Sequence, residues 1–137
     1  MVRLLQKHMA DDFFDEFSKS ASIVTKLVDG KQVIAKIDGK YWVYWGEKFV
    51  NVATSTDLVN WEPMLDENGD LLKVITPRGG KFDSSLTECG PPAIITDKGI
   101  LLMYNGKIKP VQKAIHFIQQ ILIAPDKHCL MQKIRLS

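Results

Sequence analysis

The sequence predicts an all-β fold built from repeated four-stranded units. From residue 20 onward, short β-branched and aromatic runs alternate with Gly turns, which is typical of strands and hairpins. The stretches "VIAKIDGKYWVYWG" (33–46) and "AIITDKGILLMYNG" (93–106) share one order of strand, Gly turn and second strand. Such repetition at roughly 50–60 residues indicates the blades of a β-propeller.

The first predicted unit begins at Ser20 and consists of four short strands. Asp-Gly pairs stand in two of its turns, and such a pair between apolar runs is a strong hairpin signal. We therefore expect an antiparallel meander with strands over residues 20–27, 31–37, 41–46 and 49–55.

The aromatic residues of the third strand are expected to be core. Strand alternation places Trp42 and Tyr44 on one face and Tyr41 and Trp45 on the other. Both faces of a blade pack against neighbouring blades, which favours core packing over an exposed binding surface.

A turn, a strand and a long loop are predicted next. In the turn 54–64, Asp57 is expected to fold back on the backbone through its side-chain oxygens, as structure rather than as a catalyst. "LLKVIT" (71–76) is a short predicted strand. Pro and Gly punctuate residues 77–92, which we expect to be loop.

The two ends of the chain differ from this pattern. Residues 1–19 form a lead-in segment, either a short amphipathic helix around Phe13, Phe14 and Phe17 or an extended stretch. After residue 107 the strand-and-turn pattern stops. In the tail 108–137, the spacing of Ile115, Ile118, Gln119 and Leu122 predicts a moderately amphipathic helix. The expected organisation is thus a lead-in, a β domain over 20–107 and an unlike tail.

The composition is that of a globular protein. The chain has 137 residues, 45% of them hydrophobic and 25% charged, which fits one domain. A net charge of +2 favours neither nucleic acid nor an anionic membrane as partner. No run approaches the roughly 20 apolar residues of a membrane span, and the first residues do not resemble a signal peptide. We therefore expect a cytoplasmic location.

No metal or cofactor site is predicted. Cys89 and Cys129 lack a metal-type spacing, and we expect two buried or idle thiols. The three histidines (His8, His116 and His128) do not cluster with carboxylates in the sequence. Neither a Gly-rich phosphate loop nor a Ser-His-Asp order is found.

Three stretches carry a family resemblance: "GKYWVYWGE", "VNVATSTDLVNWEP" and "FDSSLTECGPPAIITDKGILLMYNGK". They resemble the five-bladed β-propeller glycosidases, in particular the glycoside hydrolase family 130 group of mannoside phosphorylases, β-mannosidases and predicted glycosidases. The resemblance covers roughly residues 13–107. It implies about one and a half four-stranded antiparallel blades. Because five blades close the family's ring, we predict an incomplete, inactive fragment with a non-family C-terminal tail.

The tail suggests a cause for this break. Read one base out of frame with permitted codons, residues 108–137 yield a string that resembles the family's expected continuation, including a Gly-Asp loop and a Tyr-Thr-Ala-Asn strand. We hypothesise a single-base frameshift near Lys107. The nucleotide sequence of the gene tests this, and the hypothesis fails if the bases after codon 107 open no propeller-like frame.

Asp83 and Glu88 are the predicted catalytic residues. Glycoside cleavage needs an acid to protonate the leaving oxygen and usually a second carboxylate as base or nucleophile. Asp83 resembles the family's Asp in the Phe-Asp-Ser block, which implies sugar binding or acid/base work; a loop cap is the alternative. Glu88 stands where phosphorylase relatives carry a small residue, which suits a hydrolase, whereas a solvated loop acid is the alternative.

Four further residues are predicted to bind substrate: Arg78, Ser84, Asn105 and Glu47. Asn105 replaces the His with which phosphorylase relatives help to hold phosphate, which favours hydrolysis over phosphorolysis. Arg78 is the nearest cation, with a solvated loop side chain as the alternative. Glu47 follows the strand end at Gly46, where it would face the central funnel.

The resemblance implies a glycoside hydrolase that acts on mannoside-type or other β-linked oligosaccharides through carboxylate acid/base catalysis. A glycoside phosphorylase fragment and a non-catalytic carbohydrate-binding or partner-docking module are the alternatives. Carbohydrate is the expected partner. Open blade edges would also favour self-association or aggregation.

Overall fold

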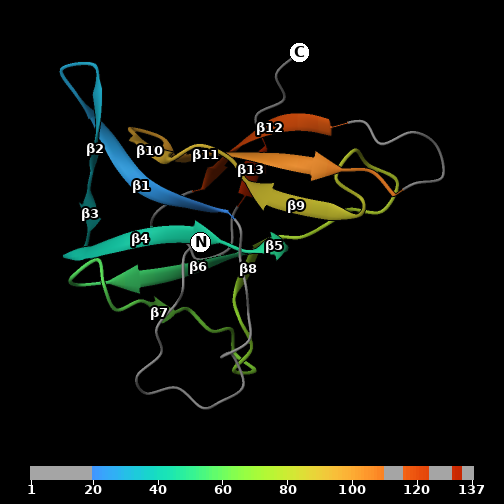
Figure 1. The fold of residues 1–137 in the computed structure, drawn as a ribbon, viewed down its shortest axis with the longest axis horizontal. Helices are drawn as coiled ribbons and strands as arrows, with labels where there is room; N and C mark the ends of the chain where they lie inside the picture. Colours follow the sequence, from blue (N-terminus) through green and yellow to red (C-terminus); the bar gives the residue numbers. More distant parts are fainter. Residues whose placement is uncertain (1–19, 110–115, 124–130, 134–137) are drawn as a thin grey trace.

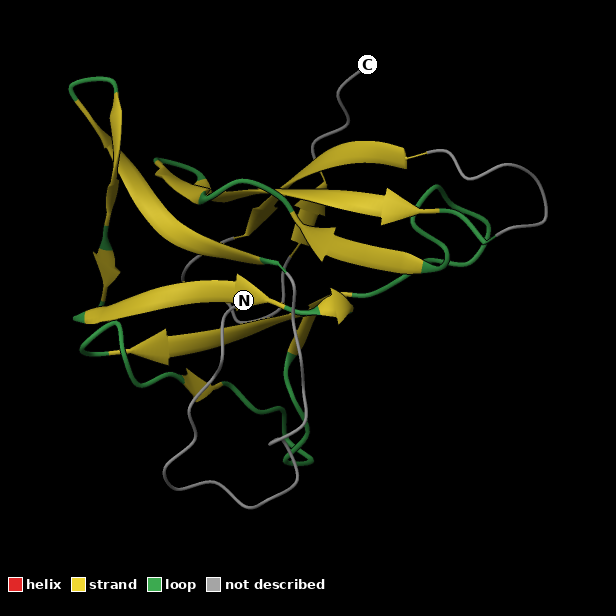
Figure 2. Cartoon of the chain, viewed as in Figure 1, coloured by secondary structure: helices red, strands yellow, loops and turns green. Residues whose placement is uncertain are grey.

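The computed structural model describes residues 20–109 in full and the backbone of residues 116–123 and 131–133. All regular structure in these residues is strand, as Figure 2 shows, so the predicted all-β class is confirmed. No helix in the described residues has the length and apolar character that a membrane crossing needs. The strands are β1 (Ala21–Val28), β2 (Lys31–Ile34), β3 (Lys36–Ile37), β4 (Lys40–Trp45), β5 (Glu47–Lys48), β6 (Val50–Ser55), β7 (Glu62–Pro63), β8 (Lys73–Ile75), β9 (Leu86–Cys89), β10 (Ala93–Thr96), β11 (Gly99–Lys107), β12 (His116–Ile123) and β13 (Met131–Lys133).

Hydrogen bonds join the strands into one mixed sheet, whose main path is β13-β12-β11-β10-β1-β4-β6-β7. In Figure 1 a lower group (β4, β6, β7 and β8) and an upper group (β9 to β13) lie on either side of β1. Residues 21–23 of β1 pair antiparallel with β4, residues 25–28 pair antiparallel with β2, and Val24 and Thr25 pair parallel with β10. There the hydroxyl of Thr25 donates to the carbonyl of Ala93 at 2.7 Å. β1 therefore belongs to both groups.

The four predicted N-terminal strands are present, but they do not pair as a simple meander, because the first pairs directly with the third. The expected strand over 31–37 is split at Ala35, so that β2 pairs with β1 while β3 pairs with β4. The N–H of Ala35, which is buried, donates to the carbonyl of Val24 at 3.2 Å. This bond turns the chain from one partner strand to the other, and it leaves the first half of β1 to pair directly with β4.

The prediction of a continuous loop over 77–92 is wrong, because it contains β9. The Gly and Pro residues mark only the ends of this stretch. Between them, Leu86–Cys89 alternate between half-buried and buried positions and pair with β11 on one side and β5 on the other. Backbone partners supplied by distant segments therefore decide the structure here.

The helix predicted in the tail is also wrong where the structure describes it. Residues 116–123 form β12, which pairs antiparallel with β11 over eight residues. A stretch rich in Ile suits a strand, and β11 offers it a full row of backbone partners. Residue 115 and the lead-in residues Phe13, Phe14 and Phe17 lie outside the described residues, so the lead-in alternatives stay predictions.

Two apolar clusters cover the two faces of the lower group. Tyr44 belongs to the larger cluster, which extends to Leu102 and Tyr104 of β11, and Trp42 packs against it. Val43 and Trp45 belong to the smaller cluster, against which Tyr41 packs. The predicted division of the aromatic strand between two packed faces is therefore confirmed.

Candidate functional site

Glu47, Glu88 and Asn105 lie side by side across three strands. Glu47 on β5 pairs with Glu88 on β9, and Glu88 pairs with Asn105 on β11. Directly opposite residues project from the same face, with Cβ atoms about 4.5–5.5 Å apart. We call these three residues the carboxylate row. The sequence suggested each of them separately, and the structure places them together.

The row lies on the more exposed face of the upper group. Glu47 is exposed, and Glu88 and Asn105 are half-buried, whereas the alternate positions Thr87 and Cys89 are buried. The hydroxyl of Thr87 donates to the carbonyl of Lys48 at 2.8 Å, which fastens β5 to β9. The buried side chains of β9 thus fix the strand, and its other face presents Glu88.

Two carboxylates directly opposite each other weaken a sheet when nothing neutralises them. Among the described residues, neither Glu47 nor Glu88 forms an ion pair. Proteins that break a local stability rule of this kind usually do so at functional sites. The carboxylate row is therefore the strongest candidate for a site in the described residues.

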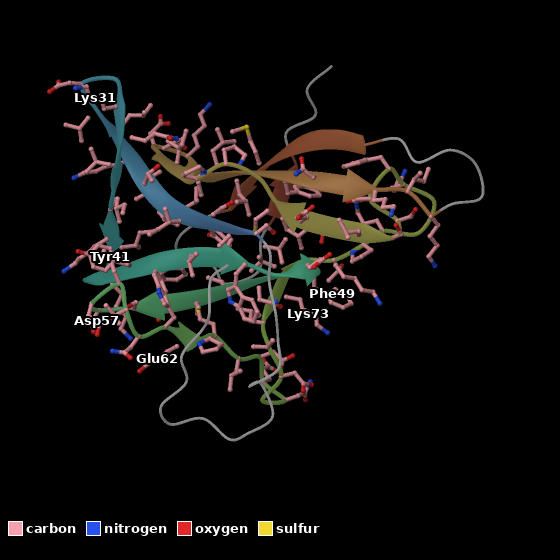
Figure 3. The ribbon with its side chains drawn as sticks, viewed as in Figure 1. Lys31, Tyr41, Phe49, Asp57, Glu62 and Lys73 are labelled. Carbon is pink, nitrogen blue, oxygen red and sulfur yellow. The ribbon has the colours of Figure 1, made fainter. Side chains whose placement is uncertain are left out.

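Glu47 is presented by a tight connection between β4 and β6. Gly46 has a φ of 128°, and a Cβ added there would collide with the carbonyl oxygen of Phe49. The ring of Phe49 has the ammonium groups of Lys48 and Lys73 at 5.3 and 4.5 Å from its centroid (Figure 3). Residues 46–49 are thus held by close backbone packing and by cation–π contacts.

Asp83 lies at the centre of a buried polar cluster. Its side chain has no exposed surface, and its two carboxylate oxygens lie 3.0 and 2.9 Å from Nε of Arg78. The hydroxyl of Tyr104 donates to the same carboxylate at 2.7 Å. Burial, followed by this bond to Asp83, raises the pKa of Tyr104 well above its ordinary value, so its proton stays in place. We call Arg78, Asp83 and Tyr104 the buried clamp.

The clamp fixes the segment before β9 onto the end of β11. The N–H of Ser85 donates to the carbonyl of Lys107 at 2.8 Å, and Ser84 Oγ accepts from the N–H of Lys109 at 2.9 Å. A Cβ on Gly106 would meet the ring of Phe82 at 2.5 Å and Asp83 Cβ at 2.8 Å. This close packing explains why the strand end carries Gly at position 106.

The predicted site residues therefore fall into two sets. Glu88, Glu47 and Asn105 form the outward carboxylate row, whereas Asp83, Arg78 and Ser84 make internal contacts. Tyr104 is the clamp residue that the sequence reasoning missed. Its signal was the alternation along β11, which places residue 104 on the buried face, where a phenol hydroxyl needs a partner.

Asp57 has the structural role that the sequence predicted. Its carboxylate accepts from the backbone N–H groups of Val59 and Asn60 at 2.9 and 2.8 Å. These bonds hold the pKa of Asp57 well below its usual range, because they favour the charged form. Within the described residues, no three His, Cys, Asp or Glu side chains gather closely enough to hold a metal ion.

Cys89 should make the folded chain sensitive to alkaline pH. Burial raises the pKa of this thiol to about 12, from an ordinary value of 9.0. The unfolded thiol ionises first, so its contribution to stability is complete below pH 9 and is lost as the pH rises toward 12. We expect the free energy of unfolding to fall by about 1 kcal/mol per pH unit in this window.

Chemical denaturation between pH 8 and 11 measures this loss. Cys89→Ala is the control, because it retains the buried Tyr44 and Tyr104, which also resist ionisation. The wild-type chain should lose stability more steeply than Cys89→Ala above pH 9. Parallel curves for the two proteins would contradict the assignment.

No protein-family model and no curated protein matches the chain. Solved structures do match it over most of its length. A protein from Bacteroides thetaiotaomicron VPI-5482, assigned as a glycosidase, is 68% identical with a TM-score of 0.83, over 93% of this chain and 39% of that one. An assigned glycoside hydrolase from Parabacteroides distasonis ATCC 8503 is 49% identical with a TM-score of 0.85. The match covers 96% of this chain and 40% of that one.

A third structure is 48% identical with a TM-score of 0.81, over 89% of this chain and 36% of that one. It is described with the statement that the GH130 family of mannoside phosphorylases contains glycoside hydrolases that target β-1,2 mannosidic linkages in Candida mannan. The chain thus spans about two fifths of the length of these relatives.

Proposed function

Since the chain is related to glycosidases of the glycoside hydrolase family 130 group, as its sequence predicted, we propose that it carries part of a glycosidase site centred on Glu88. The carboxylate row is the observation that carries this proposal. It gathers two carboxylates and an amide on one accessible face, held by strands on both sides of Glu88. In this site Glu88 is the acid/base carboxylate, and Glu47 is the second carboxylate.

The spacing of the two acids supports these roles. Glycosidases that retain the anomeric configuration hold their carboxyl groups about 5–5.5 Å apart, and inverting ones about 6.5–9.5 Å apart. Opposite residues in a sheet have Cβ atoms about 4.5–5.5 Å apart. Two flexible Glu side chains that start from this separation reach either arrangement.

The other predicted residues have supporting roles in this proposal. Asn105 donates and accepts hydrogen bonds with sugar hydroxyls, because its amide lies next to Glu88 in the row. Asp83, with no exposed surface, acts as a positioning residue through the buried clamp. Arg78 and Ser84 belong to the same support, through their contacts with Asp83 and Lys109.

The proposed architecture is part of a five-bladed propeller. The two strand groups joined by β1, and the repeat of the hairpin β10–β11, support blades as the structural unit. The exposed edges of such strands also support the proposal that the chain self-associates.

β-1,2-Mannosides are the proposed substrates, since one relative's description names these linkages. The test substrate is therefore β-1,2-mannobiose, with released mannose measured by chromatography. Glu88→Gln keeps the size of the side chain but removes its titrating proton. We expect it to lower mannose release at least about a hundredfold, the usual loss when acid/base catalysis is removed.

Glu67→Gln is the matched control, because Glu67 is an exposed turn residue far from the row in the pairing scheme. It should leave mannose release unchanged. Equal and measurable rates for Glu88→Gln and the wild-type chain would refute the assignment of Glu88. Release of mannose 1-phosphate only when phosphate is added would instead favour the phosphorylase alternative.

The prediction that the chain alone is an inactive fragment remains open to the same assay. If the chain is inactive, a second measurement still detects sugar binding. The chain is titrated with mannobiose, and the backbone amide signals are followed by NMR. We expect the backbone amides of the carboxylate row to shift in the wild-type chain and not in Asn105→Ala. A folded chain that neither binds nor cleaves the sugar would contradict the proposed function.

A further inference from the structure

Two buried polar atoms lie on neighbouring strands of the lower group. The indole nitrogen Nε1 of Trp45 and the side-chain oxygen Oδ1 of Asn51 are buried, and no described group hydrogen-bonds to either. Trp45 is 2% exposed and Asn51 is 5% exposed. Trp45 on β4 pairs directly with Asn51 on β6, so the two side chains project from the same face.

Such atoms are rare in folded proteins, where the large majority of buried polar atoms have a partner. Each one left unpaired lowers the folding equilibrium constant by about tenfold to a hundredfold. Two unpaired buried polar atoms in one residue pair would therefore lower the stability of the fold considerably at a single point in the sheet. Their coincidence therefore indicates one shared partner rather than two separate faults.

A reversed Asn amide does not account for the pair. A Cβ added to Gly46 would lie 2.8 Å from Nδ2 of Asn51 and would also collide with the carbonyl oxygen of Phe49. The amide nitrogen and this carbonyl oxygen therefore lie close to the same point. Exchanging Nδ2 and Oδ1 would place a second acceptor oxygen near this carbonyl in place of a donor, so the present orientation is the favourable one.

The chemistry of the two atoms restricts the partner. The indole N–H only donates and would repel a cation, whereas the amide oxygen only accepts and would repel an anion. One group that both accepts and donates satisfies both atoms. Since neither atom is accessible at the surface, this group is small enough to be enclosed.

We propose that a single water molecule binds between Trp45 and Asn51. Its oxygen accepts the indole hydrogen of Trp45, and one of its hydrogens is donated to Oδ1 of Asn51. The site lies where β4 ends and the connection 46–49 begins, directly before Glu47. The bound water thus helps to support the connection 46–49. This inference does not depend on the glycosidase proposal.

Water–protein cross-relaxation NMR on the full isotope-labelled chain tests the proposal. The indole proton of Trp45 should show a cross-peak to a water molecule of long residence. Trp42 is the internal control, because its indole nitrogen donates to the carbonyl of Ile37 at 3.3 Å and needs no water. Trp45→Phe assigns the signal by removing it.

Asn51→Leu distinguishes a shared water from one that belongs to Trp45 alone. It should abolish the Trp45 cross-peak and leave the Trp42 indole signal unchanged. A cross-peak that persists in Asn51→Leu would overturn the shared site. If this variant does not fold, the wild-type spectrum decides, because an indole proton of Trp45 without any water cross-peak overturns the proposal by itself.

Discussion

Replacement of Asp83 by alanine is expected to lower the free energy of unfolding by about 3 kcal/mol. The substitution removes the buried carboxylate that pairs with Arg78 and accepts the hydroxyl hydrogen of Tyr104. The loss lies at the lower end of the range for broken buried ion pairs, since the Arg78 side chain is 26% exposed and keeps some hydration.

Chemical denaturation measures this loss against Asp97→Ala, the same substitution in the exposed turn between β10 and β11. Asp97→Ala should change stability by less than about 0.5 kcal/mol. Tyr104→Phe provides an intermediate case, with a loss of about 1 kcal/mol, because it removes the hydrogen bond to Asp83 and keeps the ring. If Asp83→Ala unfolds at the same denaturant concentration as Asp97→Ala, the buried clamp does not stabilise the chain.

Gly46→Ala is expected to destabilise the chain by about 3 kcal/mol. Two costs combine at this position. A φ of 128° is unfavourable for any residue with a Cβ, and the new methyl group would collide with the backbone of Phe49. Backbone cannot swing aside as the end of a flexible side chain can, so the connection 46–49 must shift as a whole.

Gly69→Ala separates the two costs. Gly69 also has a positive φ, 82°, but a Cβ there would have open space around it. We expect a loss of about 1 kcal/mol, from the backbone conformation alone. Equal losses in Gly46→Ala and Gly69→Ala, measured by denaturation, would show that the contact between residues 46 and 49 has no energetic weight.

Local patterns were sufficient to predict the strands that hairpin turns define. Asp-Gly pairs mark the turns beside β1 and β4, and a Gly turn between apolar runs marks the β10–β11 hairpin, because these signals lie within a few residues of the strands that they organise. β9 and β12 were missed for the opposite reason. β9 depends on partner strands on both sides, β5 and β11, and β5 is distant in the sequence. β12 follows β11 directly in the chain, but its apolar spacing also fits a helix, and only the pairing with β11 decides for a strand.

The candidate site likewise combines features that the sequence predicts with features that only the fold decides. The sequence singled out Glu47, Glu88 and Asn105 by residue type and by motif. Their common row depends on the register of β5 and β11 against β9, which no motif in the sequence encodes. The sequence also left the role of Asp83 open between catalysis and a loop cap, and its complete burial against Arg78 became apparent only from the fold.

The strand β1 also constrains the order in which the chain folds. Its first half finds β4 after some twenty residues, whereas the bond between Thr25 and Ala93 closes a separation of 68 residues. Contacts of such long range form slowly, because the intervening chain loses conformational entropy before the contact is made. On a ribosome, the lower group therefore emerges and pairs before β10 is synthesised, so Val24 and Thr25 of β1 gain their parallel partners only later.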